Sequence, residues 1–222
     1  MVKKLAVVGI LGLFAAFGLF IVAIRIMADK APEPVFGKTS NKKFQSGDII
    51  FQTSKSSQSR AIQLATKSKY SHMGIIYETD GQFYVYEAIQ PVKLTKLSDW
   101  IVRGEDSHYV VKRLKQAESL LTNSNLKKIQ RVGKKFEGKN YDVYFEWSND
   151  RIYCSELVWK IYKEALDVEI GTLQKLRDFD LANEIVKKKL VERYGDEIPL
   201  DEKVISPSSI FDSDKLIMVH EN

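Results

Sequence analysis

The spacing of apolar residues changes along the chain and predicts strands in some segments and helices in others. The segment GDIIFQT at 47–53 opens with a turn signal and continues as a short apolar strand. In the next segment, SSQSRAIQLATKS at 56–68, Ala61, Ile62 and Ala65 recur at helical spacing behind a serine. Serine is a favoured N-cap residue, so a short amphipathic helix is predicted here.

A β-hairpin is predicted at 71–89, SHMGIIYETDGQFYVYEAI, where two β-rich runs flank Asp80 and Gly81. This dipeptide is typical of a two-residue hairpin turn. Later apolar patterns predict one strand and three helices, at 108–114, 125–136, 154–166 and 180–194. The fold class is therefore α+β, with a small antiparallel sheet and helices from both halves of the chain.

The predicted hairpin brings a histidine close to a glutamate. If Asp80 and Gly81 are the two central residues of the turn, Gly74 lies directly opposite Glu87. His72 is then on the same face, one diagonal step from the Glu87 carboxylate, and Gly74 has no side chain to block the path. A loop of three or five residues would instead place His72 and Glu87 on opposite faces.

The N-terminal region contains a run of about 20 residues without charge, at 5–24, which is long enough to cross a hydrocarbon core. Lys3 and Lys4 precede it, and no clear small-x-small cleavage site follows before Arg25. An uncleaved membrane anchor is favoured, and secretion after signal cleavage is the second choice. We expect an anchor or signal segment at 1–28, a linker at 29–43 and one domain at 44–222.

The composition of the 222 residues is that of an ordinary folded protein, with 44% hydrophobic and 28% charged residues. The formal net charge of +5 comes from lysines spread along the chain, without a nucleic-acid recognition motif. We therefore expect no nucleic-acid partner. A basic domain tethered to a bilayer is well suited to lie against anionic head groups. Composition says nothing about oligomeric state.

The chain has one cysteine, Cys154, which excludes an internal disulfide framework and a metal site built from several cysteines. The histidines His72, His108 and His220 do not have the spacing of metal ligands. Neither a metal ion nor another cofactor is expected.

Cys154 stands in the first turn of the predicted helix at 154–166. The free N–H groups and positive dipole end at a helix start favour a thiolate and can stabilise an oxyanion. His72 beside Glu87 would supply a general base with an orienting carboxylate. The alternatives are an inert core cysteine and a histidine that packs in the sheet. Glu156, in the same first turn, opposes thiolate formation.

Four motifs together resemble a known family: GDIIFQ, SHMG, YVYEA and YCSEL. They are similar to those of the YiiX-like permuted papain-fold amidases, the circularly permuted branch of the NlpC cell-wall hydrolase superfamily. The late segment ISPSSIFDSDKLIMV also resembles the closing segment of that family. The resemblance spans about residues 46–219 and implies a cysteine hydrolase with the papain-like order rearranged.

Carried over to this sequence, the resemblance implies Cys154 as nucleophile, His72 as base and Glu87 as the residue that orients the histidine. We assign Tyr153, Tyr141 and Ser71 to the substrate pocket.

The superfamily implies cleavage of an amide bond in a cell-envelope substrate, such as a peptidoglycan stem peptide, by a membrane-anchored domain outside the cytoplasm. One alternative is a lipid acyl hydrolase or acyltransferase at the membrane. Another is an envelope scaffold without turnover.

Overall fold

A computed structural model describes residues 43–222. Its main sheet has six strands in the order β10-β5-β1-β2-β3-β4, and each neighbouring pair is antiparallel. The bounds are β1 Ile49–Gln52, β2 His72–Thr79, β3 Gln82–Glu87, β4 Lys93–Lys96, β5 Val110–Leu114 and β10 Leu216–Glu221. Two small sheets pair β6 (Asn140–Tyr141) with β7 (Arg151–Ile152), and β8 (Gln174–Lys175) with β9 (Lys203–Val204).

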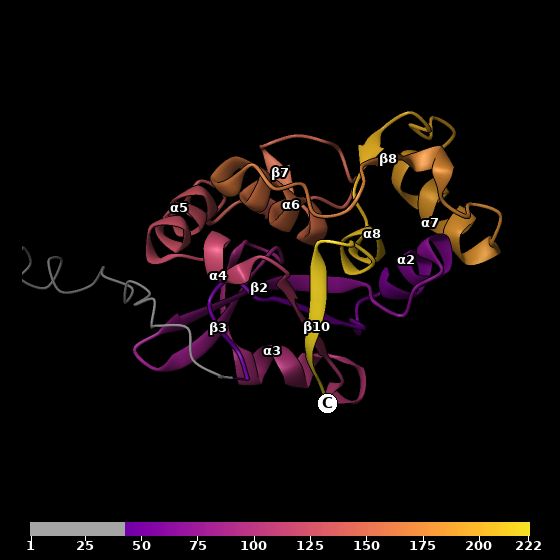
Figure 1. The fold of residues 1–222 in the computed structure, drawn as a ribbon. Coiled ribbons are helices and arrows are strands. Elements are labelled where there is room, and N and C mark those ends of the chain that lie inside the picture. Colours follow the sequence, from indigo (N-terminus) through magenta and orange to yellow (C-terminus); the bar gives the residue numbers. More distant parts are fainter. Residues whose placement is uncertain (1–42) are drawn as a thin grey trace, which may run out of the picture. The chain divides into compact units, whose positions relative to one another are not determined.

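Helices cover both faces of the main sheet (Figure 1). The helices are α2 Ser59–Thr66, α3 Leu97–Arg103, α4 Ala117–Leu120, α5 Asn123–Lys134, α6 Cys154–Leu166, α7 Glu184–Tyr194 and α8 Pro207–Phe211, with short 3-10 turns at Glu105–Ser107 and Leu176–Asp178. Helices α5 and α6 lie on one side of the sheet, and α3 lies on the other. To the side of these layers, α2 packs against α7.

The alternation of side chains along the strands builds a core on each face of the sheet. Ile49 and Ile75 belong to the larger core, together with Leu157 of α6. Their neighbours Ile50 and Ile76 belong to the smaller core on the α3 side. This arrangement follows from the period of two in a strand, which sends successive residues to opposite faces.

The predicted α+β class, with a small antiparallel sheet packed with helices, is confirmed. The predicted hairpin register is also confirmed, because Thr79 pairs with Gln82. Asp80 and Gly81 both have positive φ, 50° and 74°, as a type I′ turn requires. The helix predicted at 154–166 has the predicted bounds.

Other predicted boundaries shift. The N-cap of α2 is Gln58 rather than a serine, and its side chain does not cap the helix. Helix α7 begins at Glu184 rather than at 180, because Asn183 accepts a hydrogen bond from the backbone of Ile185 and starts the helix there. Helix α5 begins two residues earlier than predicted, after the N-cap Thr122.

The predicted N-terminal segments lie outside the described residues. The apolar run at 5–24 and the linker at 29–43 therefore stay predictions, apart from residue 43 itself. Among residues 43–222, none of the helices combines the length and the apolar character needed to cross a bilayer.

Candidate active site

The hairpin β2-β3 brings His72 and Glu87 into direct contact. Ile75 pairs with Tyr86, so the next position of the register sets Gly74 opposite Glu87, as the sequence predicts. Nε2 of His72 lies 2.6 Å from Oε2 of Glu87. The approach depends on Gly74, because a Cβ at this position would lie only 2.7 Å from the carbonyl oxygen of Tyr86.

Glu87 is fully buried and is held by three side chains. Its Oε1 accepts a hydrogen bond of 2.5 Å from Oγ1 of Thr95 and another from the guanidinium of Arg103, the last residue of α3. Burial opposes ionisation, but the hydrogen bonds from His72 and Thr95 and the charge of Arg103 hold the pKa of Glu87 below its ordinary value. The carboxylate is thus ionised and fixed in orientation.

His72 is buried between Glu87, Cys154 and the indole of Trp100. The imidazole stacks on Trp100 with ring centres 5.9 Å apart and an angle of 25° between the planes. Burial by itself lowers the pKa of His72, but the interactions with Cys154 and Glu87 outweigh it and raise the pKa to about 9. The imidazole is therefore protonated at neutral pH.

Cys154 is the first residue of α6, and its side chain is almost completely buried. Helix α6 packs against β2, the strand on which His72 is the first residue. The apolar stripe of the helix, Leu157, Val158 and Ile161, fills the core and fixes the position of the helix start. The N–H groups of the first helical turn have no partners within the helix, so this end can hold negative charge.

Glu156 also lies in the first turn of α6, where a carboxylate opposes a thiolate. The side chain is fully buried, and Oε1 lies 2.7 Å from Nζ of Lys160. Burial raises the pKa of Glu156 to about 7, although the hydrogen bond and the charge of Lys160 act in the other direction. Its charge is therefore only partial at neutral pH and is opposed by an adjacent ammonium group.

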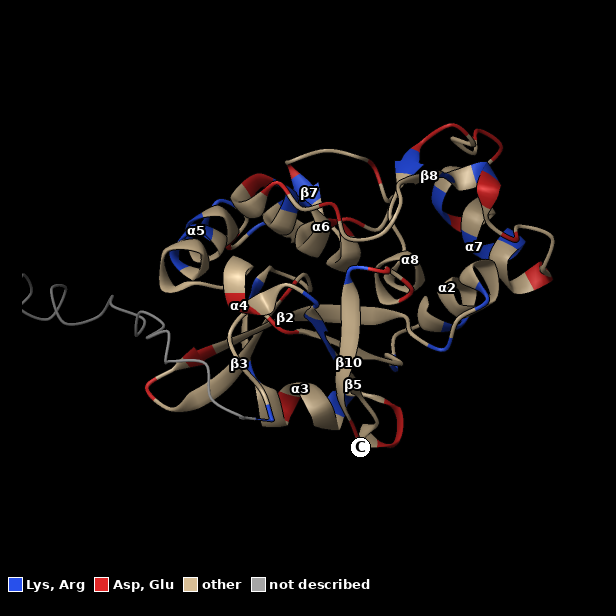
Figure 2. Ribbon diagram, viewed as in Figure 1, with Lys and Arg blue, Asp and Glu red and all other residues tan. Residues whose placement is uncertain are grey.

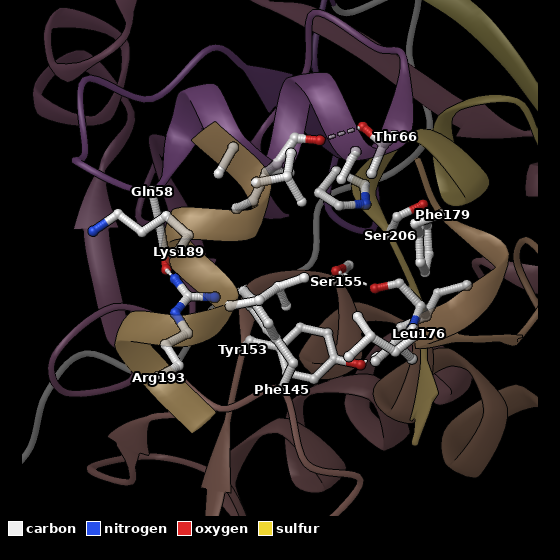
Figure 3. Close-up of a pocket in the computed structure, with 18 of the residues that line it drawn as sticks. Gln58, Thr66, Phe145, Tyr153, Ser155, Leu176, Phe179, Lys189, Arg193 and Ser206 are labelled. Atoms are coloured by element: carbon white, nitrogen blue, oxygen red, sulfur yellow. Dashed lines mark hydrogen bonds between the residues drawn. The ribbon is translucent and has the colours of Figure 1, made fainter. Parts of the chain in front are cut away.

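Cys154 lines a pocket of about 730 Å³, its open mouth included. Figure 3 shows other side chains of its wall, among them Tyr153 and Ser155. Its walls come from α2, α7 and the segments around β6, α6 and β9. Tyr141 and Tyr153 line it, and their contact with substrate stays a prediction. Ser71 does not line the pocket, and its hydroxyl instead lies 2.6 Å from that of Ser59 and accepts a hydrogen bond from the backbone N–H of Ser54.

Three residues near the site have no signal in the sequence pattern. Thr95 and Arg103 reach Glu87 from β4 and α3, and Gln58 lies at the pocket wall. Each makes its contact through the tertiary fold, so spacing along the chain does not reveal it. The short α3 could have been suspected from LSDWIVR, but the partner of Arg103 could not.

The mixed fold, with the histidine strand before the cysteine helix, fits a permuted papain-like fold. The chain belongs to the family of permuted papain-like amidases, YaeF/YiiX, C92, whose model matches residues 43–220. It is 50% identical over 175 residues to the uncharacterized protein YiiX of Escherichia coli (strain K12), an alignment that covers 79% of this chain and 85% of that protein.

A crystal structure of the metalloprotein yiiX from Escherichia coli O157:H7 is also similar, with a TM-score of 0.78 and 49% identity, over 82% of this chain and 99% of that one. Within residues 43–222 of the present chain, no three His, Cys, Asp or Glu side chains are grouped so that they could hold a metal ion. Nε2 of His72 is already taken by Glu87.

Proposed function

We propose that this protein is a thiol-dependent amidase or peptidase, with Cys154 as nucleophile, His72 as general base and Glu87 as the residue that orients the base. The observation that carries the proposal is the contact between Glu87 and His72, on the strand against which the helix of Cys154 packs. Glu87 occupies Nε2 of the imidazole, which leaves Nδ1 for the thiol.

In the first half of the reaction, Cys154 and His72 start as a thiolate–imidazolium pair, the proton of the thiol having passed to the imidazole, and the thiolate sulfur attacks the carbonyl carbon of the substrate. N–H groups at the start of α6 stabilise the oxyanion. The imidazolium then donates its proton to the leaving nitrogen, the C–N bond breaks, and an amine departs. The acyl group remains on Cys154 as a thioester.

In the second half, His72 accepts a proton from water, and the resulting hydroxide attacks the thioester carbon. The C–S bond breaks, the thiolate of Cys154 is regenerated, and the acyl group leaves as a carboxylic acid. Glu87 stabilises the imidazolium whenever it forms, because the carboxylate stays ionised and in contact with the ring.

The proposed substrate is an amide of the cell envelope, related to peptidoglycan. The resemblance to the NlpC cell-wall hydrolase branch supports this substrate class. The apolar run at 5–24 supports attachment to the membrane. The resemblance to cell-wall hydrolases supports a domain outside the cytoplasm.

The nucleophile is tested with Cys154→Ala on a panel of muropeptides. We expect a folded protein whose turnover falls by about 10³-fold or more. His108→Ala is the matched control, because His108 lies away from the pocket and bonds to the chain end through Asn222. Wild-type turnover by Cys154→Ala would contradict the proposal, and a large loss of stability would favour an inert core cysteine.

A lipid acyl hydrolase or acyltransferase is the second candidate, because the pocket beside Cys154 is lined mainly by apolar side chains. A screen of phospholipids against muropeptides distinguishes the two substrates. An envelope scaffold without turnover is the third candidate, and it predicts that mechanism-based thiol probes leave Cys154 unlabelled.

The tether is tested by membrane fractionation. The full-length chain should remain with membranes during alkaline carbonate extraction, and a chain that begins near residue 41 should be released. A soluble full-length protein processed near residue 28 would indicate a signal peptide instead.

A further inference from the structure

We infer that the pocket beside Cys154 selects substrates that combine an apolar group with an anionic group, and that Arg193 binds the anion. The inference rests on the proposed function, because it takes the pocket as the substrate site. It adds a specificity-determining residue and a charge requirement to that function.

The composition of the pocket wall gives the first argument. Most of the wall is aliphatic or aromatic, and the pocket holds the thiol at one end. Two cations line it, Lys189 and Arg193, both from α7, whereas no aspartate or glutamate of residues 43–222 does so. An apolar group is favoured inside the pocket, and a negative charge is favoured where these cations lie.

The two cations have different partners. Nζ of Lys189 lies 2.7 Å and 3.0 Å from the two carboxylate oxygens of Glu192 and points away from the other pocket side chains (Figure 3). Arg193 is half-buried and, among residues 43–222, forms no ion pair with a carboxylate within 4 Å. The positive charge left for a ligand is therefore that of Arg193.

The guanidinium of Arg193 is held in a fixed orientation. One of its N–H groups donates to Oε1 of Gln58 at 2.6 Å, and its carbon lies 4.7 Å from the ring centre of Phe145. Both neighbours are neutral, so they position the cation without neutralising it. A guanidinium has five N–H donors, and those not used by Gln58 can form the paired hydrogen bonds that carboxylates and phosphates accept.

Arg193 is linked to the thiol along one wall of the pocket. Gln58 accepts from Arg193 and donates through Nε2 to the hydroxyl of Tyr141 at 3.0 Å. Tyr141 and Cys154 in turn both line this pocket. A substrate whose carbonyl lies at Cys154 can therefore place an apolar group in the pocket and an anion at Arg193.

The test measures protection of Cys154 from iodoacetamide by matched probes, with alkylation followed by intact mass. N-acetyl-leucine is compared with N-acetyl-leucinamide, and hexyl phosphate with hexanol, so each pair differs in charge. The proteins are wild type, Arg193→Gln, and Lys188→Gln as the control. Lys188 is an exposed residue of the same helix outside the pocket, so both variants lose one positive charge of α7.

We expect the anionic probe of at least one pair to protect wild type and Lys188→Gln at about tenfold lower concentration than its neutral partner. The advantage should disappear in Arg193→Gln. A better result with N-acetyl-leucine identifies a carboxylate as the anion, and a better result with hexyl phosphate identifies a phosphate.

Equal protection by charged and neutral probes in wild type would overturn the inference, as would an advantage that survives in Arg193→Gln or a failure of all four probes to bind. If iodoacetamide does not react with Cys154 at all, the thiol mechanism fails instead. The probe affinities are then measured by calorimetry, with the same outcomes deciding the role of Arg193.

Discussion

His72 and Glu87 touch through Nε2 and Oε2 at 2.6 Å, although 15 positions separate them in the chain. The carboxylate is fully buried and ionised, and the imidazole beside it has a pKa of about 9. The pair therefore carries opposite charges at neutral pH. In the proposed mechanism, this arrangement keeps the base oriented and stabilises its protonated form next to the thiolate.

Replacing Glu87 with glutamine should weaken this stabilisation. We expect Glu87→Gln to lower kcat/KM on the order of 100-fold, less than His72→Ala, because an amide can still accept a hydrogen bond from the ring. As pH rises through the pKa of His72, about 9, the imidazolium loses its proton and kcat/KM should fall. Without the charge of Glu87 the pKa of His72 should be lower, so this alkaline fall in kcat/KM should occur at lower pH in the variant. The rate of Cys154 alkylation at a fixed neutral pH provides an independent measurement, and it should be lower in the variant.

The control for this prediction is Glu118→Gln, which removes an exposed carboxylate from α4. Unchanged turnover and an unchanged rate of Cys154 alkylation in Glu87→Gln would mean that another residue orients His72.

Arg103 should act on the reaction through Glu87. Burial raises the pKa of Glu87, and the positive charge of Arg103 lowers it. In Arg103→Ala this charge is absent, so the pKa of Glu87 should rise. The acidic limb of the kcat/KM profile should then move to higher pH, and the rate at the optimum should fall about tenfold. Arg103→Lys keeps the charge and should restore part of the effect. If the acidic limb is the same in both variants and wild type, Arg103 has no such role.

Gly74 should not tolerate a side chain. A Cβ at this position would lie 2.4 Å from Cγ1 of Val85 and 2.7 Å from the backbone carbonyl oxygen of Tyr86, so Gly74→Val must displace β3 near Glu87. We expect a loss of about 1–3 kcal/mol in the free energy of unfolding, together with reduced turnover. Urea denaturation and activity measure the two effects. Gly81→Asn is the control, because this turn position has open space and asparagine tolerates positive φ.

Glu156 should make stability depend on pH. Its pKa is about 7 in the folded protein and 4.5 ordinarily, so the folded state binds the proton more tightly. Below pH 4.5 this group contributes on the order of 3 kcal/mol to the free energy of unfolding. That contribution is lost as pH rises through 7. Glu156→Gln should lack this pH-dependent contribution, so the stability of the variant relative to wild type should increase between pH 5 and pH 8. Urea denaturation at both pH values measures it, and equal pH dependence would contradict it.

The local parts of the site could be predicted from the sequence. The turn Asp80-Gly81 fixes the parity of the hairpin, and parity alone places His72 and Glu87 on one face. The bounds of α6 follow from a strongly periodic apolar pattern that ends at Leu166. In both cases the deciding interactions lie within a short stretch of chain.

The parts that depend on distant contacts could not be predicted. Gln58 looks like an ordinary polar residue before a helix, but its side chain bonds to Tyr141 and Arg193, which are far away in the sequence. The start of α7 depends on which of several polar residues caps the helix, and Asn183 does so in place of Asp180. The basic residues of α5 and α7 are among many spread over the described elements (Figure 2), so charge along the sequence did not single out Arg193.

During synthesis, the residues around His72 are made before Cys154, because they come earlier in the chain. His72, Glu87, Thr95 and Arg103 all lie within one continuous segment that leaves the ribosome before Cys154 does. These residues can therefore come together around the imidazole before Cys154 is present. The thiol arrives later and meets the histidine only when α6 docks on β2, so a nascent or partly folded chain carries a cysteine of ordinary reactivity.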